Sequence, residues 1–364
     1  PIKEHKVNYM IRKMKSKKLK RWGTICVAAL TAGALLCSCG SQQFVAKNKI
    51  HVGVTYYNQS DTFLNELLEC FVEDLKDSGK DAVETTVTIR DAAGSQRTQN
   101  DQVKELIDAG CDVLCVNLVD RADPSEIIDL ARECDVPIVF FNREPVAEDL
   151  LQWDKLYYVG ADAEQSGILQ GELASDLIKQ DGSTDRNGDG KIQYVILEGE
   201  AGHQDAIIRT ENAVETMKNN GVELEKLSYQ IANWNRAQAQ NRMQQMIGQY
   251  GDGIELVLAN NDDMALGAVD AYEKSELSEE DYPVFFGIDG TDVGVQAVAD
   301  GAFAGTVYND KEGQAEAMAE LAVVLATGDG LQNLEFERGK YIYLPYEKIT
   351  RENVSTFFEA AVPG

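Results

Sequence analysis

Short apolar runs of strand length alternate along the chain with longer segments of helical periodicity. A helix is predicted over residues 63–75, where apolar residues recur on one face at Leu64, Leu67 and Phe71. We predict strands over residues 51–56, 83–89, 112–116, 137–141, 194–197, 254–258, 284–288 and 305–307. Because such runs alternate with helices, the predicted fold class is α/β, with doubly wound, Rossmann-like parallel sheets covered by helices on both faces.

The length of the chain favours two domains rather than one. About 326 residues remain once the N-terminal segment described below is set aside, which is more than one ordinary hydrophobic core holds. No low-complexity linker separates the two halves, so we expect a tight hinge made of several segments. The sequence has no G-x-G-x-x-G after a strand and no Walker A motif, so it gives no support for a nucleotide role.

The first 38 residues have the pattern of a targeting segment. A basic stretch, residues 12–21, precedes an apolar run, residues 22–36, that is shorter than the roughly 20 apolar residues of a membrane-spanning helix. The following Leu-Cys-Ser-Cys-Gly resembles a bacterial lipobox, which implies cleavage before Cys39 and lipidation of its thiol. The alternative is an uncleaved anchor helix. Since the chain opens on Pro1, we expect translation to start at Met10 or Met14.

The rest of the chain is strongly acidic. The full chain has a net charge of −27, and removing the basic targeting segment leaves a net charge of about −35. Such a charge argues against nucleic acid or an anionic membrane surface as a partner and suits a solvated protein outside the cell. The four remaining cysteines stand in apolar contexts and are predicted core residues: Cys70, Cys111, Cys115 and Cys134.

Residues 185–193, Asp-Arg-Asn-Gly-Asp-Gly-Lys-Ile-Gln, match the first nine positions of an EF-hand calcium loop. Gly190 stands at position 6, where the chain must turn sharply, and position 7 needs only a backbone carbonyl. The candidate ligands are Asp185, Asn187, Asp189, Lys191 and Gln193. Position 12 is Ile196 instead of Glu, so a distant carboxylate must complete the site. The alternative is an ordinary turn rich in Asp and Asn.

Polar residues follow several predicted strands at their carboxyl ends, where ligands gather in sheets of this kind. These residues are Asp61, Asn117, His203, Asp205, Arg209, Asn261, Asp289 and Asn309. One Asn at a strand end is usually a helix cap or a turn former, but their recurrence in both halves favours a shared polar cleft. Carboxylates accept hydrogen bonds from sugar hydroxyls, Arg donates in a planar fork, and Asn does both. Trp234 offers a stacking surface for a pyranose, although packing at an interface is the alternative.

From about Lys49 to the end, the chain resembles the D-galactose/D-glucose-binding proteins of bacterial ABC sugar importers, which have the periplasmic-binding-protein type I fold. The resemblance is carried by residues 52–57, 61–63, 116–120, 139–142, 157–160, 202–205 with Arg209, 259–262 and 304–310. The half EF-hand is the most specific of these features, because most other sugar-binding relatives of this fold lack it.

The resemblance implies a role for each residue of the predicted cleft. Phe63 and Trp234 would sandwich the hexose ring, and Asp61 would accept either orientation of the 4-hydroxyl, so galactose, glucose and methyl-galactoside are the expected ligands. The hydrogen-bonding residues would be Asp61, Asn117, His203, Asp205, Arg209, Asn261, Asp289 and Asn309. For a structural Ca²⁺, the resemblance implies Glu255 as the missing bidentate carboxylate. The chain departs from the family at Gln204, where Pro is frequent, and at Lys191, where Gln is found.

The resemblance also implies a division of the chain into two lobes. A signal peptide, 1–38, and a tether, 39–48, precede them. The chain would cross between the lobes near 135–136, 309–310 and 342–343. The N-terminal lobe then comprises 49–135 and 310–342, and the C-terminal lobe comprises 136–309 and 343–364 with the calcium loop.

The implied function is that of a non-enzymatic, lipid-anchored receptor that closes around a monosaccharide and delivers it to an ABC permease. We expect a monomer that touches the membrane only through its lipid; engagement of a chemoreceptor is left open. One alternative is a glycoside hydrolase using paired carboxylates such as Asp205 and Asp289. Another is a sugar-responsive repressor of the same fold, which would need a helix-turn-helix where this chain has its lipobox.

Overall fold

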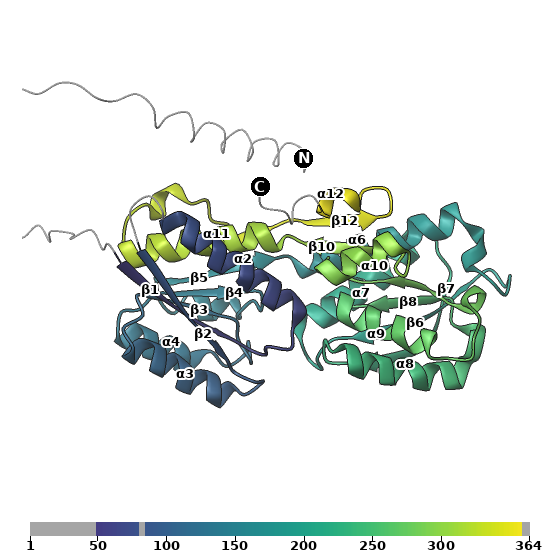
Figure 1. Ribbon diagram of the computed structural model, residues 1–364, viewed down its shortest axis with the longest axis horizontal. Coiled ribbons are helices and arrows are strands. Elements are labelled where there is room, and N and C mark those ends of the chain that lie inside the picture. Colours follow the sequence, from purple (N-terminus) through teal and green to yellow (C-terminus); the bar gives the residue numbers. More distant parts are fainter. Residues whose placement is uncertain (1–48, 80–83, 359–364) are drawn as a thin grey trace, which may run out of the picture. The chain divides into compact units, whose positions relative to one another are not determined.

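The computed structural model describes residues 49–79 and 84–358, which belong to one compact unit. The predicted signal peptide, the tether with Cys39 and both candidate start codons lie outside the described residues. The described chain forms two six-stranded sheets with helices packed on them (Figure 1). We call the two sheets with their helices the N-terminal lobe and the C-terminal lobe.

The first sheet has the strand order β11-β5-β4-β3-β1-β2, and all of its pairings are parallel. Its strands are β1 (Lys49–Tyr56), β2 (Glu84–Asp91), β3 (Val113–Val116), β4 (Ile138–Phe141), β5 (Leu156–Ala161) and β11 (Tyr341–Leu344). Its helices are α2 (Thr62–Gly79), α3 (Gln96–Asp108), α4 (Ser125–Glu133), α5 (Ala147–Leu150) and α11 (Lys311–Thr327), with the 3₁₀ turn η4 (Leu331–Asn333). Every residue of β3 and β4 is buried, as continuous apolar runs in a parallel sheet should be.

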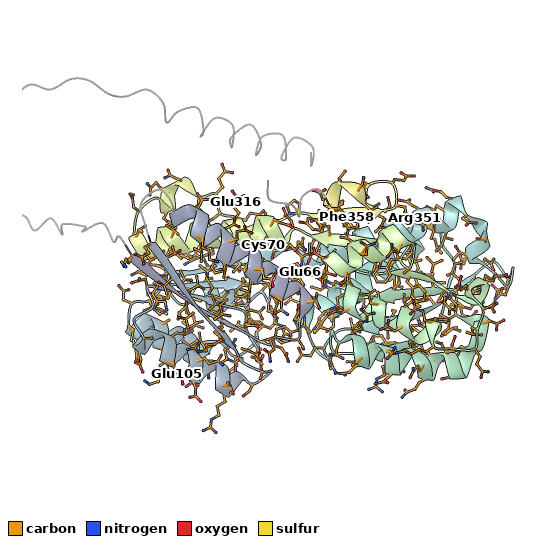
Figure 2. All side chains as sticks on the ribbon, viewed as in Figure 1. Glu66, Cys70, Glu105, Glu316, Arg351 and Phe358 are labelled. Carbon is orange, nitrogen blue, oxygen red and sulfur yellow. The ribbon has the colours of Figure 1, made fainter. Side chains whose placement is uncertain are left out.

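Two apolar cores lie on the two faces of this sheet. Helices α2 and α11 pack together on one face, where Leu64, Phe71 and Met318 belong to one buried apolar cluster with the strand residue Val54. Figure 2 shows their neighbouring positions, with Glu66 and Cys70 on α2 and Glu316 on α11. Helices α3 and α4 cover the other face. The apolar spacing seen in the sequence therefore predicted the buried face of α2 correctly.

The second sheet has the strand order β12-β10-β9-β8-β6-β7, and only the β12–β10 pair is antiparallel. Its strands are β6 (Ile192–Glu198), β7 (Leu224–Ile231), β8 (Leu256–Ala259), β9 (Val284–Phe286), β10 (Gly305–Asn309) and β12 (Tyr346–Thr350). Its helices are α6 (Ala163–Gln180), α7 (Gln204–Asn219), α8 (Arg236–Tyr250), α9 (Asp262–Glu273), α10 (Asp292–Asp300) and α12 (Ser355–Phe358), with the 3₁₀ turns η1 (Gly182–Thr184), η2 (Gly251–Gly253) and η3 (Glu279–Asp281). The predicted fold class, α/β with two doubly wound sheets, is confirmed.

The lobe boundaries differ from the prediction. The crossing expected near 135–136 is wrong, because β4 pairs with β3 and β5 pairs with β4 in the first sheet. The chain instead leaves the first sheet after β5, at Asp162, and α6 packs on the second sheet. The crossing expected near 342–343 lies at Pro345, because Tyr343 and Leu344 still pair with β5. The third crossing, predicted near 309–310, lies at Asp310, between β10 and α11.

Two other observations bear on the sequence analysis. Cys111 and Cys115 are buried as predicted and Cys70 is half-buried, whereas Cys134 is exposed at the end of α4. Among the residues that the structure describes, no helix is both long enough and apolar enough to cross a membrane.

Candidate binding site

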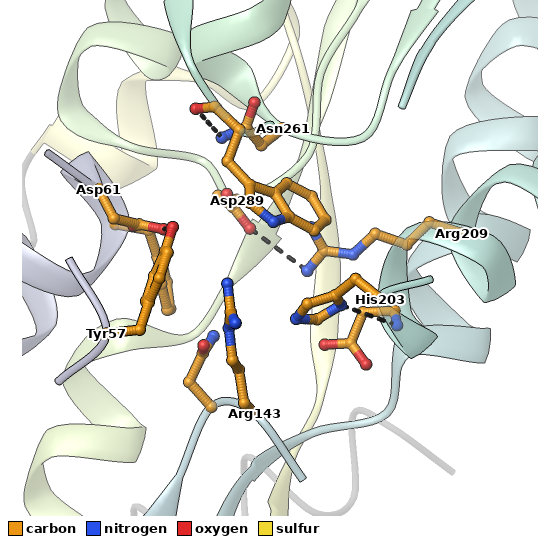
Figure 3. A pocket seen from close by; sticks show the side chains of 11 residues that line it. Tyr57, Asp61, Arg143, His203, Arg209, Asn261 and Asp289 are labelled. Carbon is orange, nitrogen blue, oxygen red and sulfur yellow. Dashed lines mark hydrogen bonds and ion pairs between the residues drawn. The ribbon is translucent and has the colours of Figure 1, made fainter. Parts of the chain in front are cut away.

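The carboxyl ends of strands from both lobes meet at a pocket (Figure 3). Its empty space, which includes an open mouth, is about 360 Å³. It is lined by Tyr57, Asp61, Phe63, Asn142 and Arg143 of the N-terminal lobe and by His203, Asp205, Arg209, Trp234, Asn261 and Asp289 of the C-terminal lobe. The structure thus brings eight of the ten predicted sugar-binding residues to one pocket.

Arg209 is the buried cation of the pocket. Its Nη1 donates to the Asn260 carbonyl at 2.7 Å, and its Nη2 donates to Tyr346 Oη at 3.1 Å and lies 3.4 Å from Asp289 Oδ1. Its Nε is buried and has no hydrogen-bond partner among the described residues. Because a buried donor without an acceptor costs free energy, this atom favours a ligand that brings an oxygen.

Asp289 faces Arg209 from the loop after β9. Burial raises the pKa of Asp289 well above its ordinary value, and the Arg209 guanidinium opposes that shift. The backbone of Asp289 has φ 112°, a conformation that residues other than glycine rarely adopt. Backbone strain of this kind is concentrated at ligand sites, where the surrounding structure holds it in place.

His203 and Asp205 begin helix α7 and face the same space. The Asp205 backbone N–H donates to His203 Nδ1 at 3.2 Å, so His203 serves as the N-cap of α7. Burial, reinforced by Arg143, Arg209 and Arg121, lowers the pKa of His203 well below its usual value. The ring is therefore neutral and presents an Nε2–H donor to the pocket. Burial raises the pKa of Asp205, against the opposing effect of Arg209.

The two aromatic residues predicted to sandwich the sugar ring come from opposite lobes. Phe63 is buried in the core under α2, and Trp234 is partly buried against the core of the C-terminal lobe. His203 meets the Trp234 ring edge-on, with 5.2 Å between ring centroids, and the Arg209 guanidinium lies 5.8 Å from the Trp234 centroid. A Cβ at Gly199 would come within 2.2 Å of that indole, so the close approach requires glycine. Trp234 therefore packs against the core of its lobe and also lines the pocket.

Two pocket residues, Asn261 and Asp61, also cap helices, which was the structural alternative to ligand binding. Asn261 Oδ1 accepts from the Met264 backbone N–H at 2.9 Å and caps α9, while its Nδ2 donates to the Trp234 carbonyl at 3.3 Å. Asp61 Oδ1 accepts from the Leu64 N–H at 2.9 Å at the start of α2. Capping and lining the pocket therefore occur in the same residues.

Two predicted residues, Asn117 and Asn309, lie behind the pocket wall. Asn117 is fully buried; its Oδ1 accepts from the Tyr57 backbone N–H at 3.1 Å and its Nδ2 donates to Asn142 Oδ1 at 3.0 Å. Asn309 Oδ1 accepts from Gln314 Nε2 at 2.6 Å. In this arrangement the two amides hold the wall in place without forming its surface.

Three residues of the pocket were missed: Tyr57, Asn142 and Arg143. The Arg143 guanidinium lies 3.8 Å from the Tyr57 ring centroid, and its Nη2 reaches Glu200 Oε2 of the other lobe at 2.8 Å. Tyr57 Oη donates to Asp61 Oδ2 at 2.6 Å. Tyr57 directly follows β1 and Asn142 directly follows β4, so the strand-end rule that found the other residues could have found these two; Arg143 lies one residue further along.

The predicted calcium residues form one loop away from the pocket residues. Asp185 Oδ1 and Oδ2 accept from the backbone N–H groups of Gly188 at 2.8 Å and Gly190 at 2.9 Å. Both glycines have left-handed φ, 71° and 83°, as the sharp turns require. The Asn187 amide donates to Gln193 Oε1 at 2.9 Å. The side-chain amine of Lys191 is directed to Glu225, 3.3 Å away.

Glu255 reaches this loop from the position just before β8. It is buried, its Oε1 accepts from the Arg186 backbone N–H at 2.7 Å, and its Oε2 accepts from the Gln193 N–H at 3.0 Å. Within the part of the chain that the structure describes, no three His, Cys, Asp or Glu side chains converge as a metal site. The candidate set therefore depends on amide and carbonyl oxygens beside its carboxylates, and an all-oxygen set of this kind suits a hard cation such as Ca²⁺.

Two lobes built on mostly parallel sheets, with a charged pocket at their strand ends, are typical of two-lobed solute-binding proteins. Residues 52–330 match the periplasmic binding protein domain, and the chain belongs to that family. The chain is 33% identical over 336 residues to the D-galactose/methyl-galactoside binding periplasmic protein MglB of Haemophilus influenzae, an alignment covering 92% of this chain and 98% of that protein.

Two further relatives show the range of ligands in the family. A putative rhizopine-binding protein of Rhizobium meliloti is 30% identical over 286 residues, covering 78% of this chain and 85% of the relative. The crystal structure of an ABC transporter solute binding protein from Bacillus halodurans C-125 with bound myo-inositol superimposes with a TM-score of 0.70 at 27% identity, covering 86% of this chain and 98% of that one.

These relatives are substrate-binding proteins of transporters and not enzymes, and this chain is likewise a binding protein. The hydrolase alternative through Asp205 and Asp289 finds no support among them. Membership of the family places the protein outside the cytoplasm and makes a sugar-like solute and an ABC importer its partners.

Proposed function

We propose that the protein is the receptor of an ABC importer for D-galactose and D-glucose, with methyl-galactoside as a further ligand. The observation that carries the proposal is the meeting of eight predicted sugar-binding residues in one pocket, where Arg209 Nε finds no acceptor among the described residues. A hexose supplies hydroxyl oxygens to Arg209 and hydroxyl donors to Asp205 and Asp289. The likeness to a galactose-binding relative over almost the whole chain supports the same ligand.

Binding requires both lobes, because the aromatic walls come from opposite sides. Phe63 belongs to the N-terminal lobe and Trp234 to the C-terminal lobe, so a ring between them is enclosed only when the lobes close. Asp61, held by Tyr57, is the group that we propose to meet the 4-hydroxyl in either orientation.

A cyclic polyol is the second candidate, because the solved relative from Bacillus halodurans holds myo-inositol. Titration calorimetry of the chain purified without its targeting segment, with D-galactose, D-glucose, myo-inositol and D-ribose, separates the two. We expect micromolar or tighter binding of both hexoses. D-Ribose should bind far more weakly, because polar groups placed for the sixth carbon's hydroxyl would be left unpaired on closure. Tighter binding of myo-inositol than of either hexose would replace our proposal with the second candidate.

We also propose that the loop at residues 185–193 binds a structural Ca²⁺. The side chains of Asp185, Asn187, Asp189 and Gln193, the Lys191 carbonyl and a bidentate Glu255 would hold it. The fit rests on the buried Glu255 carboxylate, which the structure brings to this loop from a strand more than 60 residues away. A cation bound only by the folded protein would add to its stability.

For the membrane attachment, we propose lipidation at Cys39. A Cys39→Ala chain expressed in a lipoprotein-processing bacterium should lose membrane association while keeping its sugar binding. Persistence of the variant in the membrane fraction after alkaline washing would contradict the lipid anchor.

A further inference from the structure

A buried cation joins two carboxylates beside the Asp310 crossing. Lys311 Nζ lies 2.5 Å from Glu66 Oε2 and 2.6 Å from Asp292 Oδ1. The side chains of Lys311 and Glu66 are only 7% and 15% exposed, whereas that of Asp292 is 69% exposed. Lys311 begins α11 and Glu66 lies on α2, so both belong to the N-terminal lobe; Asp292 begins α10 of the C-terminal lobe.

A second contact reinforces this one. The Asp292 backbone N–H donates to both Glu66 carboxylate oxygens, at 3.1 and 3.3 Å. Asp292 is the first residue of α10 after its N-cap, Thr291, so a carboxylate of one lobe lies at the positive end of a helix of the other lobe. Figure 2 labels Glu66 on α2, near the end of that helix that meets the second lobe.

The two halves of this cluster respond differently to lobe opening. Lys311 and Glu66 lie on helices that pack against each other within one lobe, so their ion pair survives opening. The Lys311–Asp292 ion pair and the Asp292 N–H to Glu66 hydrogen bonds join different lobes, so a movement of α10 away from α2 and α11 breaks them. None of the three residues lines the pocket.

We propose that Lys311, Glu66 and Asp292 form an interlobe latch that stabilises the closed form and thereby tightens sugar binding without touching the sugar. The three act as positioning residues, and the proposal rests on the sugar-binding function proposed above. Loss of the latch lowers the closed fraction both with and without sugar, and the lower closed fraction of the sugar-bound protein raises the apparent dissociation constant. The effect appears in the rate of release, because only the closed form retains the sugar.

Burial gives the latch its strength. Burial alone would lower the pKa of the Lys311 amine, but Glu66 and Asp292 outweigh it and the pKa is raised. Lys311 is thus charged at neutral pH while almost inaccessible to water. Ion pairs with a buried member are screened less by salt than exposed pairs are. The latch therefore differs from the exposed pairs on the surface, such as Lys104 with Asp108.

The sharpest test is the substitution Asp292→Pro. It removes the carboxylate that pairs with Lys311 and the backbone N–H that donates to Glu66, and it leaves the Lys311–Glu66 pair in place. Proline is favoured at the first position of a helix, and Thr291 already has the extended conformation that precedes proline, with φ −60° and ψ 158°. Folding of α10 should therefore be unaffected, and the melting temperature of the sugar-free protein should stay the same.

We expect Asp292→Pro to raise the galactose dissociation constant about tenfold and Asp292→Asn about threefold, because the N–H contact remains in the second variant. Both should speed release in stopped-flow measurements and leave the association rate unchanged. The matched control is Asp300→Asn, at the exposed far end of the same helix, which changes the same charge and should have no effect. Equal affinities and release rates in wild type and Asp292→Pro would overturn the latch.

A measurement without sugar separates this proposal from the binding function. Small-angle scattering of the sugar-free protein should show a larger radius of gyration for Asp292→Pro than for wild type, because the open form gains population. If wild type binds none of the four test sugars, the proposed function fails while the scattering comparison still decides the latch. Identical scattering curves for the two proteins would contradict it.

Discussion

The pocket and the loop at residues 185–193 use the same polar residue types in opposite ways. In the loop, the oxygens of Asp185 and Glu255 already accept backbone N–H groups from the loop itself. In the pocket, Arg209 keeps a buried donor that has no partner within the described part of the chain, and Asp289 is held in a strained backbone conformation beside it. The loop's own turns supply hydrogen-bond partners for its carboxylates. The buried donor in the pocket needs an acceptor from a ligand.

This difference teaches how to tell a ligand site from a structural site when both are rich in Asp and Asn. The loop is organised by its own backbone, so a metal there would add stability to an existing turn. The pocket is organised by two separate lobes, and its unsatisfied groups would make contacts only when a ligand is present. Substitutions should therefore reduce affinity at the pocket and stability at the loop.

The largest effect is expected from Arg209→Met. It removes the buried cation and leaves Asp289 buried without its partner, a change that typically costs about 2–5 kcal/mol of binding free energy. Galactose affinity measured by calorimetry should fall at least about thirtyfold. The control Arg242→Met, on the exposed face of α8, should bind like wild type. Full affinity in Arg209→Met would mean that the pocket is not the sugar site.

The buried carboxylate of Asp262 should make the stability of the protein depend on pH. Burial raises the pKa of Asp262 to about 7 from 3.8, against the hydrogen bonds from Thr306 and Thr291. The folded protein thus holds this proton more tightly than the unfolded chain, so the contribution of Asp262 to stability is lost as the pH rises from about 4 to about 7. The change should amount to a few kcal/mol.

Urea unfolding at several pH values measures this contribution. The stability of wild type relative to Asp262→Asn, which cannot ionise, should decrease between about pH 4 and pH 7 and stay constant above it. Parallel stability curves for the two proteins would show that Asp262 ionises as freely in the folded protein as in the unfolded chain.

Trp234→Ala sharpens the comparison within the pocket itself. Loss of a large aromatic contact should weaken galactose binding by roughly 1–3 kcal/mol, measured by calorimetry. The melting temperature should move less, because the indole is only partly buried against the core. A variant that melts early and keeps wild-type affinity would assign Trp234 to packing alone.

The smallest effect is expected at the loop. Chelation of the mature protein with EGTA should lower its melting temperature by a few degrees, since each kcal/mol corresponds to about 2–4 °C in a protein of this size class. Added calcium should restore it, and Glu255→Gln should imitate chelation. Galactose affinity should hardly change. The same melting temperature with chelator and with excess calcium would show that the loop is an ordinary turn that binds no calcium.

The sequence predicted most of the buried strands and the edge strand β2, but it missed the buried strand β5 and the edge strands β7, β11 and β12. Runs such as 137–141 are apolar throughout because both faces are covered. Strand β7 pairs only with β6, is half exposed, and has mixed polar and apolar residues, so no continuous run marks it. The crossing at 135–136 was placed from the family resemblance and was wrong, and periodicity could not correct it because it does not say which sheet a buried strand joins.

The candidate site was predictable where a single strand end places a residue. It was less so where lobes meet: Arg143 reaches the pocket through contacts with Tyr57 and with Glu200 of the other lobe. Glu255 came only from the family resemblance. Its place at the loop follows from strand register, because β8 pairs with β6 and sets Glu255 beside Gln193.

One fluorescence titration tests most directly whether sugar binds in this pocket. The chain has three tryptophans, at 22, 153 and 234, and the first lies in the targeting segment. In a mature Trp153→Phe protein, Trp234 is the remaining reporter, and D-galactose should change its emission with saturation. A saturable change that is lost in Trp153→Phe and kept in Trp234→Phe, or no change in either variant, would contradict sugar binding at this pocket.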